Sequence, residues 1–151
     1  MVVIIGDWQK KEKFKEKKMR TYNLFISHSW KYGDAYDKLC NLLINTDSFS
    51  WKNYSVPQED PIQGVRTDRE LSQAIERQIQ PSSAVLILAG VYAIYSKWID
   101  REIDIAKRLK KPIIAIEPWG SERTSTVVKT NADKIVRWNS ESIIRAIREI
   151  A

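Results

Sequence analysis

The hydrophobic positions along the chain indicate a series of strands. Five segments have the composition or the spacing of β-strands, namely residues 22–27, 51–56, 84–89, 113–116 and 134–138. The first is a compact apolar run that stops at polar His28, and the second alternates loosely up to Pro57. The third and fourth are continuously apolar, which is typical of strands covered on both faces.

The segments between these strands have apolar positions at helical spacing. Each predicted helix has one inward stripe: Tyr36, Leu39, Cys40 and Leu43; Leu71, Ala74, Ile75 and Ile79; Ile99, Ile103 and Ala106; and Ile143, Ala146, Ile147 and Ile150. Thr67 and Glu70 have the spacing of a capping box. The other helices have candidate N-caps at Asp34, at Ser96, and at Asn139 or Ser140. The stretch between the fourth and fifth strands is expected to be a loop.

Strands that alternate with helices predict a parallel sheet covered on both faces. The fold class that we expect is α/β, a flavodoxin-like doubly wound domain with a mostly parallel five-stranded sheet. In such sheets, ligands bind beyond the carboxyl ends of the strands, near the point where the strand order reverses.

The charge of the chain is concentrated at its start. The 151 residues carry a net charge of +6. Residues 1–20 hold seven basic and three acidic side chains, which is +4 and leaves +2 for the remaining 131 residues. We therefore expect a basic extension at 1–20 and one domain at 21–151, with no face built to grip nucleic acid. The extension is interpreted as a short extra strand and helix, a flexible segment, or sequence upstream of a start at Met19.

Composition excludes several kinds of site. Cys40 is the only cysteine and His28 the only histidine, so an internal disulfide, a multi-cysteine zinc site and a two-histidine metal motif are excluded. No metal and no cofactor are expected. No apolar run approaches the roughly 18 residues that cross a bilayer. With no export signal recognised, a soluble cytoplasmic protein without membrane contact is expected.

The strand-end rule directs attention to residues 27–30, 57–66, 90–98 and 117–120. No glycine-rich phosphate loop and no nucleophile elbow occurs there. Trp98 and Glu102 are four residues apart and are expected to share one helix face, with the inward stripe pointing elsewhere. A carboxylate beside an indole near a cleft would stay ionised yet partly desolvated, which suits binding of sugar hydroxyls or of positive charge. A packing aromatic residue beside a solvated carboxylate explains the same spacing.

Four motifs in the right order resemble a known family. They are Phe25-Ile-Ser-His28 after the first strand, a proline-containing loop after the second, Tyr95-Ser-Lys-Trp-Ile-Asp-Arg-Glu102 after the third, and Lys111-Pro-Ile-Ile-Ala-Ile-Glu-Pro-Trp-Gly120 around the fourth. Together they resemble the TIR domain family over about residues 22–150. The similarity is greatest to the bacterial TIR-like branch found in Thoeris anti-phage defence.

The resemblance implies an activity and a catalytic residue. Enzymatic TIR domains cleave the bond between nicotinamide and ribose in NAD+, and Glu102 matches the catalytic glutamate of their W-x-x-x-E helix. The resemblance therefore implies an NAD+ glycohydrolase or ADP-ribosyl cyclase, with NAD+ as substrate and not as cofactor. Its product would be a cyclic ADP-ribose isomer or another ADP-ribose-derived signal that activates a separate effector. Self-association and a phage protein trigger are further implied partners.

The resemblance also points to substrate-binding positions. Ser27, His28, Ser29 and Trp30 lie where TIR enzymes receive the substrate, although the two serines would equally serve as caps with His28 in solvent. Trp98 is a further candidate, expected to pack under the site more than to contact substrate. Three other candidates are less specific. Trp119 would either stack on a base or anchor its loop. Asp60 and Arg66 would belong to the site, to a subunit contact or to a charged surface loop.

Many TIR domains keep the fold without catalysis. The alternative function is therefore a non-catalytic scaffold that acts by homotypic assembly. A flavodoxin-like nucleotide-binding regulator, or a nucleic-acid binder that uses the basic extension, is a third interpretation. The glutamate favours the enzyme, because a scaffold has no need of a carboxylate beside the cleft.

Overall fold

The computed structural model of the 151-residue chain describes residues 9–11, 20–27, 33–55, 67–90, 98–118 and 124–151. The expected loop at 57–66 and the candidate cap Ser96 lie outside these ranges, as does most of the basic extension.

The described strands form one parallel sheet. They are β1 (Thr21–Ser27), β2 (Ser50–Asn53), β3 (Ala84–Leu88), β4 (Ile113–Ile116) and β5 (Lys134–Val136), in the spatial order β2-β1-β3-β4-β5. The chain moves from β1 to β2 on one side and then returns to β3 on the other. The strand order therefore reverses between β1 and β3, and this is the place where a doubly wound sheet binds ligands. The predicted fold class is confirmed.

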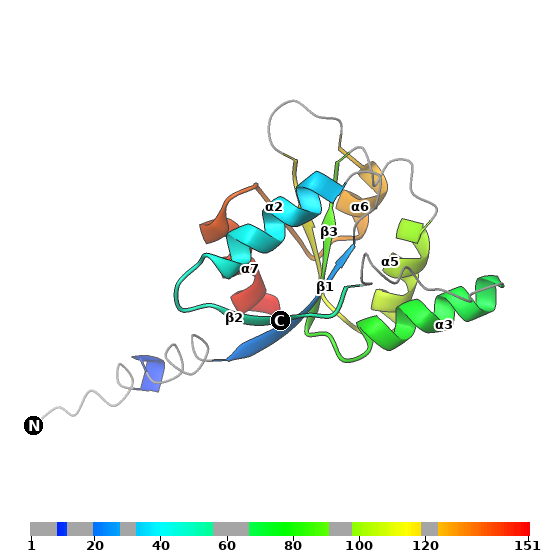
Figure 1. Cartoon of the computed structure of the whole chain (residues 1–151), viewed down its shortest axis with the longest axis horizontal. Coiled ribbons are helices and arrows are strands. Elements are labelled where there is room, and N and C mark those ends of the chain that lie inside the picture. Colours follow the sequence, from blue (N-terminus) through cyan, green and yellow to red (C-terminus); the bar gives the residue numbers. More distant parts are fainter. Residues whose placement is uncertain (1–8, 12–19, 28–32, 56–66, 91–97, 119–123) are drawn as a thin grey trace, which may run out of the picture.

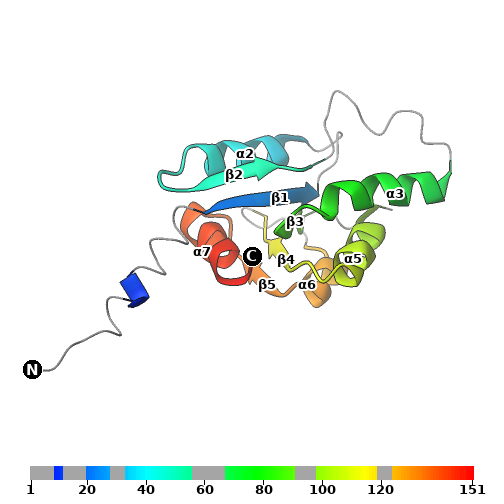
Figure 2. The ribbon, with the colours of Figure 1, turned by 90° about the horizontal axis from the view of Figure 1, so that it is seen from below.

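Helices cover both faces of the sheet. They are α2 (Gly33–Ile44), α3 (Asp68–Ile79), α5 (Trp98–Arg108), α6 (Thr126–Asn131) and α7 (Ser140–Ile150). Figures 1 and 2 show α2 and α7 on one face, with α3, α5 and α6 on the other. The buried apolar side chains divide in the same way into two clusters, one on each face.

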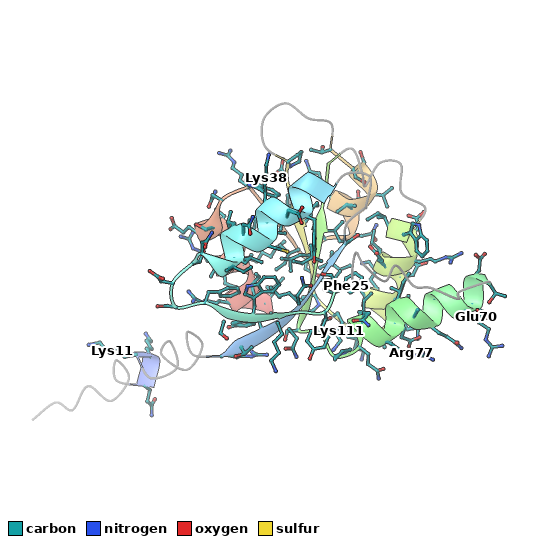
Figure 3. All side chains as sticks on the ribbon, in the orientation of Figure 1. Lys11, Phe25, Lys38, Glu70, Arg77 and Lys111 are labelled. Atoms are coloured by element: carbon teal, nitrogen blue, oxygen red, sulfur yellow. The ribbon has the colours of Figure 1, made fainter. Side chains whose placement is uncertain are left out.

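The alternation of side chains along β1 connects it to both clusters. Leu24 and Ile26 belong to the cluster under α2 and α7, whereas Phe25 belongs to the cluster under α3 and α5. In Figure 3, Phe25 lies inside the molecule, whereas Lys38 on α2 and Arg77 on α3 point away from it. Because successive strand residues face opposite sides, Ser27 is directed to the same side as Phe25, toward α5.

Local sequence determines where the helices begin. The backbone N–H of Glu70 donates to the Thr67 side chain, which confirms this N-cap of α3, and the N–H of Ser142 donates to Asn139, the N-cap of α7. The stretch between β4 and β5 is not all loop as expected, because it contains α6. This helix has six residues and buries only Val128, so it has no apolar stripe from which to predict it.

In the part of the chain that the structure describes, no helix has both the length and the apolar character required to span a bilayer.

Candidate functional site

A serine hydroxyl is buried at the strand-order reversal. Ser27 is the last residue of β1 and pairs in register with Ile87 of β3. Its side chain is 1% exposed. The residue lies at the carboxyl edge of the sheet, where the sequence placed a candidate substrate-binding position.

Glu102 approaches this edge from α5 and is also buried. The residue is 6% exposed, on a helix whose other buried residues are Ile99, Ile103, Ile105 and Ala106. Glu102 is three residues after Ile99 and four before Ala106, so it lies on the apolar stripe of the helix and not on a separate face. The expectation that the stripe points away from Glu102 is wrong, and the interpretation of Glu102 as a solvated carboxylate is excluded.

Trp98 does not share this environment. It is the first residue of α5 and is 42% exposed. Its indole is therefore partly in solvent, and the expectation that it packs beneath the site stays a prediction. The exposed part of this aromatic residue, at the start of the helix, is accessible to a ligand or to another protein.

The electrostatics of Glu102 follow from burial and from one neighbour. Burial raises the pKa of the Glu102 carboxyl from 4.5 to about 7, and the Ser27 hydroxyl acts in the opposite direction. The two groups interact without making a well-formed hydrogen bond. Among the described residues, Ser27 Oγ and Glu102 Oε2 are buried side-chain atoms that lack a hydrogen-bond partner. At neutral pH the carboxyl is therefore divided between its neutral and charged forms, whereas the sequence suggested a carboxylate that stays ionised although partly desolvated.

Unsatisfied buried polar atoms are rare in folded proteins, because each one costs the hydrogen bonds it made to water. Here a hydroxyl and a carboxyl oxygen are both unsatisfied at the same edge of the sheet. A ligand with hydroxyl groups would satisfy both. A ligand with positive charge would in addition favour the ionised form of the carboxyl.

The other candidates lie outside the described residues. They are His28, Ser29 and Trp30 after β1, Asp60 and Arg66 in the second loop, and Trp119 after β4. Their proposed roles remain predictions.

The sequence interpretation missed one buried polar residue near the site. Ser55 is 7% exposed, and its hydroxyl accepts a hydrogen bond of 2.9 Å from the backbone N–H of Ile26, next to Ser27. The signal that could have revealed it is the Asn53-x-Ser55 spacing at the end of β2, since asparagine bonds readily to the backbone N–H two residues on.

No group of three or more His, Cys, Asp and Glu side chains suited to a metal ion occurs within the described part of the chain.

Two comparisons with solved structures identify the fold. A conserved protein from Enterococcus faecalis V583 matches with a TM-score of 0.62 and 10% identity, covering 86% of this chain and 99% of that one. The CMP N-glycosidase BcmB of Clostridium botulinum matches with a TM-score of 0.50 and 14% identity, covering 83% and 97% of the two chains. At these identities the likeness shows a shared fold.

The comparison with protein families is more specific. No curated protein matches the chain. The family model for the TIR-like domain of the Thoeris protein ThsB matches residues 25–123. This segment includes the end of β1 with Ser27, the whole of β3 and α5 with Glu102, and it makes up more than half of the 151 residues. The chain therefore belongs to the family of ThsB TIR-like domains.

Proposed function

We propose that this protein is an NAD+-cleaving TIR enzyme of anti-phage defence that releases nicotinamide and makes a cyclic ADP-ribose isomer or a related signal. Glu102 is the catalytic residue, and Ser27 binds the substrate beside it. The observation that carries the proposal is the burial of the Glu102 carboxyl at the strand-order reversal, with one oxygen unsatisfied and the Ser27 hydroxyl as neighbour.

The chemistry of the reaction explains why a buried carboxyl suits it. When the bond between ribose and nicotinamide breaks, its electron pair goes to the ring nitrogen, which becomes neutral, and positive charge develops on the sugar. A carboxylate fixed in a water-poor site stabilises that charge more than a solvated one does, because it needs no reorganisation during the reaction. The hydroxyl of Ser27 would hold a ribose oxygen in the same place.

The pKa of Glu102 fits a cationic substrate. In the free protein the carboxyl titrates at about 7, so its ionised form is accessible without a large penalty at neutral pH. The positively charged nicotinamide ring would lower the pKa of Glu102, so the carboxyl would release its proton to solvent. The resulting carboxylate would lie opposite the developing cation. Water, or a nitrogen of the adenine in the same molecule, would then form the new bond to the ribose carbon, and the attacking group would release one proton to solvent.

The family and the fold give further support. The ThsB model names a Thoeris protein, which is the reason to connect the activity to defence. One protein of the same fold is a CMP N-glycosidase, so the architecture is compatible with cleavage of an N-glycosidic bond.

The test is incubation of the purified protein with NAD+, alone and in lysate of infected cells, with chromatography of the products. Wild type is expected to release nicotinamide and one ADP-ribose-derived product, whereas Glu102→Gln is not. Asp104→Asn is the matched control, because Asp104 is an exposed acid on the same helix. If Glu102→Gln released nicotinamide as fast as wild type, or if wild type released none in either condition, the enzymatic proposal would be wrong and the scaffold function would take its place.

A further inference from the structure

At the end of the β1–β2 ladder, a side-chain hydroxyl and not a backbone carbonyl accepts the hydrogen bond from β1. The last paired residues of the two strands are Leu24 and Asn53, and the N–H of Tyr54 still donates to the Leu24 carbonyl at 2.9 Å. One step further, the N–H of Ile26 donates to the Ser55 hydroxyl at 2.9 Å. In a regular parallel ladder this N–H would meet a backbone carbonyl of the neighbouring strand. Ser55 therefore extends the support of β1 beyond the end of β2.

The position of Ser55 is itself determined by two neighbours. Its backbone N–H donates to Asn53 Oδ1 at 2.9 Å, which closes a turn at the end of β2. Asn53 Nδ2 in turn donates to the Tyr36 hydroxyl of α2 at 2.7 Å. The Tyr36 hydroxyl also interacts with the side chain of Ser55. These contacts connect α2, the end of β2 and the end of β1 in one network.

The network acts one residue away from the candidate site. Ile26 and Ser27 are adjacent on β1, with Ile26 directed to the α2 face and Ser27 to the α5 face. The backbone at Ile26, together with the pairing of Ser27 with Ile87 of β3, therefore sets where the Ser27 hydroxyl lies relative to the Glu102 carboxyl. Both Ile26 and Ser55 are buried, so removal of the hydroxyl takes an acceptor away from a buried backbone N–H.

We propose that Ser55, held by Asn53 and Tyr36, is a positioning residue that fixes the carboxyl end of β1 and so orients the Ser27 hydroxyl against Glu102. The role of this network in catalysis rests on the proposed function, whereas its effect on Glu102 does not. The experiment therefore reads the state of the carboxyl itself.

The test is a titration of the Glu102 carboxyl by NMR in protein labelled with ¹³C at glutamate side chains, with Glu102→Gln to assign the signal. In Ser55→Ala the Ser27 hydroxyl is expected to act less on the carboxyl, so the pKa of Glu102 rises by about half a unit. Ser55→Thr, which restores a hydroxyl, returns the pKa toward the wild-type value.

Ser82→Ala is the matched control. Ser82 is also a buried serine, 2% exposed, whose hydroxyl donates to the Ile79 carbonyl before β3 begins. This variant loses a buried hydrogen bond without touching the network, so the pKa of Glu102 stays at the wild-type value. An unchanged pKa in Ser55→Ala, or an equal rise in Ser82→Ala, would overturn the proposal.

A second variant covers the case in which Ser55→Ala does not fold. Asn53 is exposed, so Asn53→Ala is tolerated more easily while it removes the contacts to Ser55 and Tyr36. A rise of the Glu102 pKa in the same direction supports the positioning role, and a wild-type value contradicts it. The titration needs no NAD+, so a protein inactive toward NAD+ would refute the proposed function and leave this result to stand on its own.

Discussion

The hydroxyl of Ser27 and the carboxyl of Glu102 meet as buried neighbours at the carboxyl edge of the sheet, one from a strand and the other from a helix. Burial dominates the titration of the acid and the hydroxyl only moderates it, so the pKa of the carboxyl is about 7. A group of this kind lowers the stability of the protein once it ionises, and it is retained where function requires it. The effect of Glu102 on stability and its effect on activity can both be measured.

The first prediction concerns the stability of Glu102→Gln. Between pH 4.5 and about 7, folded wild type keeps a proton on Glu102 that the unfolded chain releases. The free energy of unfolding therefore falls as pH rises through this window, by up to about 3 kcal/mol. Glutamine does not titrate, so the free energy of unfolding of Glu102→Gln does not fall in this way. Between pH 4 and pH 8 its stability relative to wild type is therefore expected to increase by the same amount.

Urea unfolding at the two pH values measures this difference, and Asp104→Asn provides the control for removal of an exposed acid. The same gap between variant and wild type at pH 4 and at pH 8 would mean that the carboxyl of Glu102 titrates alike in the folded and unfolded chains.

Two neighbouring residues at the start of α5 are predicted to differ in how much their substitution by alanine lowers the free energy of unfolding. Trp98 is 42% exposed and Ile99 is 1% exposed. Trp98→Ala is therefore expected to lower the free energy of unfolding by less than about 1 kcal/mol. Ile99→Ala opens a cavity in the core and is expected to cost about 2–5 kcal/mol. Chemical unfolding of the two variants checks the contrast, and a large loss in Trp98→Ala would show that the indole packs into the core after all.

The Trp98→Ala variant can also test whether Trp98 contacts the substrate. If Trp98→Ala keeps the fold as expected, a loss of NAD+ affinity in that variant reports a contact between Trp98 and the substrate. Unchanged affinity would remove Trp98 from the substrate-binding residues.

The sheet could be predicted from the sequence because its strands carry their own signal. The runs that became β3 and β4 are fully buried and apolar throughout, and no polar residue interrupts them. The short helix α6 carries no such signal, since Val127 beside its one buried residue is 49% exposed. Its position is determined by tertiary contacts, such as the bond from the Ser125 N–H to the Ala89 carbonyl at 2.9 Å.

The site was only partly predictable. Spacing alone grouped Glu102 with Trp98, although the same helical spacing also joins Glu102 to Ile99 and Ala106. A polar residue on an apolar stripe is itself a signal of a functional group, and this signal was available in the sequence. The role of Ser55 was not, because it depends on where β2 ends relative to β1.

Removal of the Ser27 hydroxyl is predicted to shift the pH profile of activity. That hydroxyl lowers the pKa of Glu102, so Ser27→Ala is expected to raise it above the wild-type value of about 7. If the ionised carboxyl is the active form, the midpoint of the rise of kcat/KM with pH moves to higher pH in the variant. Rates of nicotinamide release between pH 5 and pH 9 measure the shift. A midpoint that moved to lower pH would contradict the assignment of Ser27 as the neighbour of Glu102.

The N-cap of α7 offers a test of the fold away from the site. The Asn139 side chain accepts a hydrogen bond of 2.8 Å from the Ser142 N–H. Asn139→Ala is expected to lower the free energy of unfolding by about 1 kcal/mol. Asn139→Asp keeps a side-chain acceptor, so its free energy of unfolding is expected to fall little. Equal losses of unfolding free energy in the two variants, measured with urea, would argue against Asn139 as the N-cap.

In the proposed function, the carboxyl of Glu102 lies against the cationic part of bound NAD+. The most direct test of this arrangement is titration of that carboxyl by ¹³C NMR in the free protein and in the protein saturated with carba-NAD+, an analogue that keeps the charged ring and resists cleavage. Binding of the analogue is expected to lower the pKa of Glu102 from about 7 by roughly one unit or more, because the positive ring favours the carboxylate. A pKa that stays at the free-protein value while the analogue is bound would show that the carboxyl does not face the charged ring.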